Sequence, residues 1–193
     1  MRGGAEAARR AHNPKVVGSN PAPATTNKRL ILIIIRFFIY QVMKIILGLG
    51  SNLGKREENL EKACNLLQQN LGKITIKSSI IETKPWGFES QDMFLNSALV
   101  IDTDKTPFEA LSICLQIEQL LGRVRTNAQT YHSRLIDIDI LFYENQIIES
   151  SELVIPHPLI CKRDFVLIPL KGIIPEFIHP KLNIKIKDIP NPK

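Results

Sequence analysis

The order of apolar patterns between residues 44 and 143 constrains the fold of this chain more than any other feature. The run KIILGLGSN, residues 44–52, is almost continuously apolar and ends in glycines, which predicts a buried strand leading into a tight turn. Residues 54–71 place apolar side chains at three- and four-residue spacing, which predicts an amphipathic helix that ends at Gly72. A strand is therefore followed directly by a helix.

Four further segments complete a recognisable arrangement. Residues 74–83 and 94–103 predict two strands, separated by the turn-prone loop KPWGFESQD. Residues 106–122 open with Thr-Pro and continue with helical spacing, and residues 135–143, LIDIDILFY, predict another strand. The order strand, helix, strand, strand, helix, strand is typical of the ferredoxin-like α+β fold, in which two helices cover one face of an antiparallel sheet.

The rest of the chain, residues 144–193, predicts a short strand pair around Ile147 and Val154 and a helix from Asp164 to about Ile174. No transmembrane segment is predicted after Met43. A chain of 193 residues has the size of one globular domain with an appendage.

The charge of the chain divides it at residue 43. Residues 1–42 hold seven of the 25 basic residues and one of the 19 acidic residues, so this segment accounts for the whole net charge of +6. Residues 43–193 carry 18 of each sign and are neutral overall. This balance argues against a nucleic-acid-binding or membrane-binding domain.

Residues 1–42 show no apolar period that could build a core, and we expect a disordered or non-native extension. The apolar run LILIIIRFFIYQV is shorter than the roughly 20 residues a membrane-spanning helix needs, and no small-residue cleavage site follows it. The string AHNPKVVGSNPAPAT resembles the translated end of a transfer-RNA gene, which would make Met43 the true start. We expect one domain over residues 43–193.

The three cysteines are Cys64, Cys114 and Cys161. They are odd in number and lack a CxxC pair, so they predict neither a disulfide framework nor a zinc site. A reducing cytoplasm fits this pattern.

Asp137 and Asp139 are two residues apart in the otherwise apolar strand at 135–143, so both carboxylates point to one face. Two such anions repel each other unless a cation lies beside them, although an exposed strand edge would also accommodate them. Arg134 precedes the pair, and Arg123 and Arg125 follow the second predicted helix. Carboxylates that hold Mg²⁺ beside arginines that grip phosphates suit a nucleoside triphosphate, and an ion-pair network within the fold is the alternative.

Other motifs are weaker. The turn at residues 48–52 matches neither GxGxxG nor GxxxxGK[ST], so we place no phosphate there. His157 lies between two prolines, close to Lys162 and Arg163, where a phosphate could be its partner. The aromatic residues of the loop around Trp86 could close over a planar ligand or fold onto the core.

Taken together, LGLGSNLG, ETKPWGF, DMFLNSA, IExxLGRVR, SRLIDIDILFY and IPHPLICKRDF resemble, in order and spacing, the 6-hydroxymethyl-7,8-dihydropterin pyrophosphokinases of the folate pathway. The resemblance covers residues 43 to about 190. It implies a three-layer α/β/α ferredoxin-like domain that transfers diphosphate from ATP to the pterin hydroxymethyl group and releases AMP. It also implies two Mg²⁺ ions as cofactors.

The resemblance assigns roles residue by residue. The metal ligands would be Asp137 and Asp139, and these two with Arg123 and Arg134 would form the catalytic set. ATP would be bound by Glu118, Arg123, Arg125, Tyr131, Arg134, Ile140, His157 and Arg163. The pterin would be bound by Thr83, Pro85, Trp86, Phe94, Asn96 and Phe165, with the rings of Phe94 and Phe165 on its two faces.

The chain departs from its relatives at several of these positions. Tyr131-His132-Ser133 stands where many have WGP, and Phe94 where many have tyrosine. Leu115 replaces a glutamine and Glu152 an arginine of some relatives. These differences bear on individual ATP contacts rather than on the reaction.

Two functions of other classes compete with this one. A sheet-face RNA binder would need aromatics interleaved with Lys and Arg, whereas Asp137 and Asp139 would repel phosphate without a metal. A sensor of small molecules would leave the aspartate pair unexplained. We therefore expect a monomeric cytoplasmic enzyme that binds ATP and the pterin, with no nucleic-acid or membrane partner.

Overall fold

The computed structural model describes residues 42–87, 91–123 and 133–192. The extension over residues 1–41 lies outside them, so its predicted disorder stays a prediction. The strands are β1 Met43–Ser51, β2 Lys73–Lys77, β3 Ile81–Thr83, β4 Phe94–Thr103, β5 Asp137–Tyr143, β6 Ile148–Glu149 and β7 Val154–Ile155. The α-helices are α2 Arg56–Asn70, α3 Pro107–Leu120 and α4 Asp164–Ile173, and two 3-10 turns cover Ile160–Lys162 and Ile186–Asp188.

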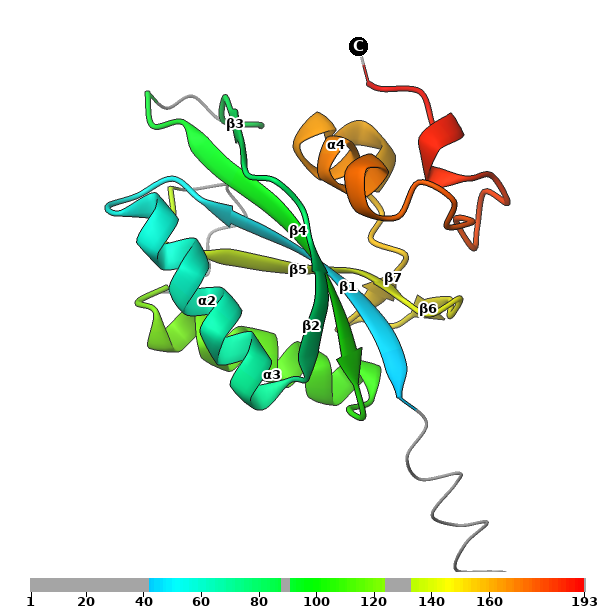
Figure 1. The fold of residues 1–193 in the computed structure, drawn as a ribbon, viewed down its shortest axis with the longest axis horizontal. Helices are drawn as coiled ribbons and strands as arrows, with labels where there is room; N and C mark the ends of the chain where they lie inside the picture. Colours follow the sequence, from blue (N-terminus) through cyan, green and yellow to red (C-terminus); the bar gives the residue numbers. More distant parts are fainter. Residues whose placement is uncertain (1–41, 88–90, 124–132, 193) are drawn as a thin grey trace, which may run out of the picture. The chain divides into compact units, whose positions relative to one another are not determined.

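The main sheet has the strand order β2-β4-β1-β5, with β3 also paired to β4, and every pair is antiparallel. Figure 1 shows α2 and α3 on one face of this sheet and α4 on the other. Each face has its own core: Leu47 and Leu67 are buried on the α2 and α3 side, and Phe142 and Leu170 on the α4 side. The ferredoxin-like α+β fold in three layers is confirmed.

The strand predicted over residues 74–83 is divided into β2 and β3, and Ser78 accounts for the division. Its backbone N–H donates to the carbonyl of Ala98 at 2.9 Å, but its hydroxyl accepts the Ala98 N–H at 2.9 Å. A side chain thus replaces one backbone acceptor of the ladder. Lys77 pairs with Leu99 and Ile81 with Asn96, so one extra residue is accommodated between the two strands.

The predicted helices begin and end close to where the sequence places them. At the start of α3, the Thr106 hydroxyl accepts the Glu109 N–H at 3.3 Å and the Glu109 carboxylate accepts the Thr106 N–H at 2.7 Å, which forms a capping box ahead of Pro107. After α2, a Cβ at Gly72 would lie 2.1 Å from the carbonyl oxygen of Asp102. Only glycine fits that close approach.

A β-bulge in β5 determines which side chains face α4. Ile46 pairs with Phe142 but Leu47 pairs with Ile140, so Leu141 is the extra residue. Leu141 and Phe142 consequently both pack in the core beneath α4. No helix in the described part of the chain is long and apolar enough to cross a membrane.

Candidate functional site

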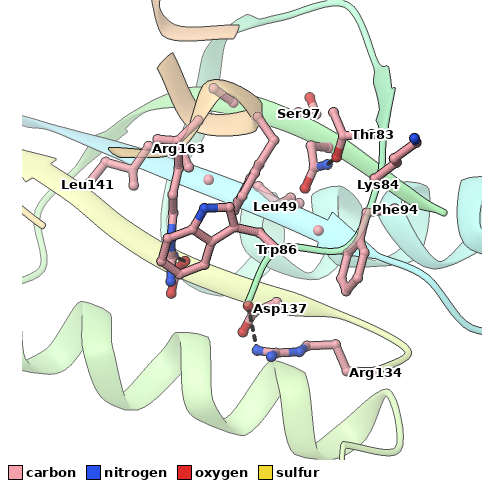
Figure 2. Close-up of a pocket in the computed structure, with 17 residues that line it drawn as sticks. Leu49, Thr83, Lys84, Trp86, Phe94, Ser97, Arg134, Asp137, Leu141 and Arg163 are labelled. Carbon is pink, nitrogen blue, oxygen red and sulfur yellow. Dashed lines mark hydrogen bonds and ion pairs between the residues drawn. The ribbon is translucent and has the colours of Figure 1, made fainter. Parts of the chain in front are cut away.

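Two pockets meet at β5. The aromatic pocket opens on the α4 side of the sheet (Figure 2), and with the surrounding open space it holds ≈ 640 Å³ of empty volume. Its lining includes Gly48, Gly50, Thr83, Lys84, Trp86, Phe94, Asn96, Arg134, Asp137, Asp139, Arg163 and Phe165. The edge pocket runs along the outer edge of β5 and is lined by Leu111, Leu115, Glu118, Arg123, Asp137, Ile138, Asp139, Ile140, Glu152, Leu153, Val154, His157 and Pro158. Asp137 and Asp139 belong to both linings, so the two carboxylates mark the boundary between the pockets.

The floor of the aromatic pocket is formed by glycines. Gly48 and Gly50 lie inside β1, opposite Asp139 and Asp137 of β5, and not in the tight turn that the sequence predicted. A Cβ at Gly50 would lie 3.1 Å from Oδ1 of Asn96 and 3.7 Å from the ring of Phe94. The missing side chains keep this part of the sheet flat and open to a ligand.

The β3–β4 pairing holds the polar wall of the same pocket. Thr83 pairs with Phe94 in the ladder, and the side-chain amide of Asn96 donates to the Thr83 hydroxyl at 2.8 Å. Thr83, Phe94 and Asn96 thus lie together as predicted, and Trp86 and Phe165 join them. Pro85 lines neither pocket, whereas its neighbour Lys84 does.

Asp137 is held by arginines on both carboxylate oxygens. Nη1 of Arg123 donates to Oδ1 at 2.6 Å, and Nη1 of Arg134 donates to Oδ2 at 2.7 Å. Arg123 also pairs with Glu118, which is 1% exposed and accepts the Ile138 N–H at 2.8 Å. The ion-pair network considered as an alternative is therefore present, and it brings Arg123 and Arg134, two of the predicted phosphate-binding cations, to the predicted metal ligand.

The negative charge of Asp139 is less well compensated than that of Asp137. The ion pair of Asp139 with Arg163 joins Oδ2 to Nη1 at 3.5 Å. Burial and then the negative charge of Asp137 raise the pKa of Asp139 to about 7, and Arg163 offsets only part of this. A carboxylate in this position favours a cation beside it.

Arg163 connects the carboxylates to the aromatic residues. The residue is 6% exposed, and its guanidinium carbon lies 4.8 Å from the ring centroid of Trp86 and 5.5 Å from that of Phe165. The sequence placed Arg163 among the ATP ligands, but its side chain lines the aromatic pocket. It reaches the boundary between the pockets through Asp139.

His157 lies in the edge pocket with Glu118, Arg123 and Ile140. Its backbone N–H donates to the Leu141 carbonyl at 3.0 Å, and its Nδ1 accepts the Leu159 N–H at 3.2 Å. Burial and the positive charge of Arg163 lower the pKa of His157 to about 4. The imidazole is therefore neutral at pH 7. Arg125 and Tyr131, also predicted to bind ATP, lie outside the described residues.

A polar cluster that the sequence analysis missed fixes the start of β5. Asn52, only 3% exposed, accepts the Arg134 N–H on Oδ1 at 2.7 Å and donates from Nδ2 to the Ser133 hydroxyl at 2.9 Å. The Ser51 hydroxyl donates to the Leu135 carbonyl at 2.6 Å. Ser51, at the end of β1, and Asn52 therefore orient the arginine that contacts Asp137, although such polar residues give no sign in the sequence of a partner 82 positions away.

The donor set at the boundary fits one class of metal. Among the residues that the structure describes, no group of three or more His, Cys, Asp or Glu side chains is arranged to hold an ion. Two carboxylates on one strand face suit Mg²⁺, which keeps several waters and takes further oxygens from a phosphate substrate. Zinc, which prefers nitrogen and sulfur ligands, is not favoured.

Comparison with known proteins points to one family. Residues 46–175 match the family model described as 7,8-dihydro-6-hydroxymethylpterin-pyrophosphokinase (HPPK). A 2-amino-4-hydroxy-6-hydroxymethyldihydropteridine pyrophosphokinase of Porphyromonas gingivalis is 42% identical over 139 residues, covering 71% of this chain and 94% of the relative. The protein of the same name from Bacillus subtilis is 44% identical over 128 residues, covering 66% and 75%.

Solved structures agree on the fold. A crystal structure of HPPK-DHPS in complex with substrates superposes with a TM-score of 0.64 at 20% identity, covering 77% of this chain and 42% of that one. A Plasmodium falciparum HPPK-DHPS triple mutant gives a TM-score of 0.62 at 20% identity, covering 79% and 45%. The chain thus spans less than half the length of these proteins.

Proposed function

The chain belongs to the 7,8-dihydro-6-hydroxymethylpterin-pyrophosphokinase family, and on that premise we propose that it transfers diphosphate from ATP to the hydroxymethyl group of 6-hydroxymethyl-7,8-dihydropterin. The products are AMP and the pterin diphosphate, and the reaction is a step of folate biosynthesis. The enzyme is accordingly an ATP-dependent diphosphotransferase.

One observation carries this proposal: Asp137 and Asp139 lie on the boundary between the aromatic pocket and the edge pocket. A flat ring in the first pocket and a triphosphate entering from the second would meet at these carboxylates. The reacting hydroxyl and the β-phosphorus must approach each other in line. The boundary is where two substrates held in separate pockets can do so.

We assign the aromatic pocket to the pterin. The rings of Phe94 and Phe165 would stack on its two faces, and Asn96 would hydrogen-bond its edge. The glycine floor supports this assignment, because a planar bicyclic ring needs a flat surface against the sheet. Thr83, with the loop at Pro85 and Trp86, would complete the wall.

We assign the edge pocket to ATP. Ile140 and the neighbouring leucines would provide apolar contact for the base. Arg123 and Arg134, from the segment between α3 and β5, and Arg163, just before α4, converge on the carboxylates. Neutral His157 would hydrogen-bond a phosphate oxygen rather than add charge. Glu118 orients Arg123, and Arg125 and Tyr131 would contribute from the segment outside the described residues.

We further propose that Asp137 and Asp139 are the protein ligands of two Mg²⁺ ions. When bound, these ions would neutralise the triphosphate and the charge that develops during transfer. The protein itself holds the alcohol and the β-phosphorus in line and surrounds the leaving AMP oxygen with guanidinium donors. No described pocket residue is an evident strong base, so positioning and charge stabilisation carry the catalysis.

The domain boundaries, cellular location and assembly remain proposals of the same kind: one catalytic domain over residues 43–193, a cytoplasmic location and a monomer. Cys64, Cys114 and Cys161 are free thiols in the structure, as a reducing compartment permits. We propose no nucleic-acid or membrane partner.

The test is incubation of the protein with Mg-ATP and 6-hydroxymethyl-7,8-dihydropterin, followed by chromatography of the nucleotides. We expect AMP in equal amount to the pterin diphosphate, and none when the pterin is omitted. ADP as the product would indicate an ordinary kinase. The absence of any pterin-dependent nucleotide conversion would overturn the proposal.

A further inference from the structure

Trp86 is the one tryptophan of the chain, and its indole lies across the guanidinium of Arg163 in the aromatic pocket (Figure 2). The loop that carries Trp86 follows β3 and forms part of the proposed pterin wall, whereas Arg163 was assigned to ATP. Trp86, which we assign to the pterin pocket, therefore contacts Arg163, which we assign to ATP. The assigned roles alone do not account for this contact.

Arg163 contacts the carboxylate of Asp139 and the rings of Trp86 and Phe165. Its ion pair with Asp139 is long, at 3.5 Å, compared with the pairs of 2.6 and 2.7 Å that fix Asp137. A guanidinium within 6 Å of an indole face is attracted by the ring, and the attraction grows as water is excluded. Arg163 is almost completely buried, whereas Trp86 is 38% exposed, so water is excluded from one partner of this contact only.

We propose that Trp86 is a positioning residue that holds the Arg163 guanidinium beside Asp139 in readiness for the phosphates of ATP. This inference rests on the proposed function, because it takes Arg163 as a nucleotide ligand. The order of the pterin-side loop is then coupled to the affinity for Mg-ATP. The coupling would act through the contact between the indole and the guanidinium, 4.8 Å from ring centroid to guanidinium carbon.

A double-mutant cycle tests the proposal. We would measure binding of Mg²⁺ with α,β-methylene-ATP by calorimetry, without pterin, for the wild type, Trp86→Leu, Trp86→Phe, Arg163→Met and the Trp86→Leu/Arg163→Met double variant. Trp86→Leu removes the aromatic face, whereas Trp86→Phe keeps one. Phe108→Leu is the matched control, because Phe108 is an exposed aromatic of α3 that lines neither pocket.

We expect Trp86→Leu to weaken nucleotide binding about two- to fivefold. This range follows from cation–π energies, because about 1.4 kcal/mol corresponds to a tenfold change in affinity. Trp86→Phe and Phe108→Leu should stay within about twofold of the wild type, and in the Arg163→Met background Trp86→Leu should have no further effect. Turnover assays should show a higher KM for Mg-ATP in Trp86→Leu.

Two results would overturn the proposal: unchanged nucleotide affinity in Trp86→Leu, with the loss confined to the KM for pterin, or an equal loss with and without Arg163. Thermal unfolding of every variant confirms that it is folded. If the wild type itself fails to bind the nucleotide, the proposed function fails; if the wild type binds and Trp86→Leu binds equally well, only the positioning role fails.

Discussion

Removing the charge of Asp137 should lower the stability of the fold, whereas removing the charge of Asp139 should not, although both variants should be inactive. Asp137 accepts from two arginines, at 2.6 and 2.7 Å, and all three side chains are less than a quarter exposed. Replacing it by asparagine keeps the shape but removes the anion between two cations. A hydrogen bond to a charged group contributes about 1.5–3 kcal/mol, and partial exposure lowers this to about 1–2 for each.

Asp139→Asn loses much less. The contact with Arg163 is 3.5 Å long, and the side chain of Asp139 is 32% exposed. Its removal also ends the repulsion between the two same-face carboxylates, which at about 7 Å and an effective dielectric constant near 20 amounts to about 2 kcal/mol. We expect Asp139→Asn to be as stable as the wild type or more stable, and Asp137→Asn to lose about 2–4 kcal/mol.

Thermal and urea unfolding at pH 8 with a chelator measures the difference, because Asp139, with its pKa of about 7, is then ionised and no metal masks the repulsion. Asp137→Asn should melt at least about 4 °C below the wild type. AMP release, measured in parallel with Mg²⁺ present, should be lost in both variants. The reasoning fails if Asp137→Asn is as stable as the wild type, or if Asp139→Asn is the less stable of the two.

Four further expectations concern other residues. Asn52→Ala leaves the Arg134 N–H without its acceptor at a cost of about 1–3 kcal/mol; kcat should fall, and Asn52→Asp, which keeps the acceptor, should retain more activity. Because the unfolded His157 takes up a proton near pH 6.5 and the folded one near 4, stability is lost as the pH falls through this interval; the difference in unfolding free energy between the wild type and His157→Asn should shrink by about 1–2 kcal/mol from pH 7 to 5. Phe165→Ala should weaken pterin binding by about 1–3 kcal/mol, more than it weakens Mg-nucleotide binding, as separate titrations would reveal. Deleting residues 1–42 should leave AMP formation and the melting temperature unchanged, and a loss of several degrees would contradict it.

Period-two patterns predicted the position of the aspartate pair correctly, because one face of β5 is buried and register errors would reverse every side chain. The start of α3 was predicted from Thr106 and Pro107, because these adjacent residues are a local signal for the beginning of a helix. Features that depend on distant partners were not predictable. The hydroxyl of Ser78 that divides β2 from β3 bonds to Ala98, and the bulge at Leu141 arises within a run that contains no glycine or proline.

The glycines of β1 illustrate how a local pattern can be correct and its meaning still hidden. Glycine within a strand costs stability, so two of them in the central strand need a compensating reason. Leu47 and Leu49 pack in the core on the α2 and α3 side, which leaves Gly48 and Gly50 on the opposite face, under the aromatic pocket. A Cβ at Gly50 would press against Asn96, and its absence leaves space close to the backbone and to the carboxylates of β5, where we propose that the pterin lies. Seen in sequence alone, the same two glycines signal only a turn, since nothing local tells which strands will flank them.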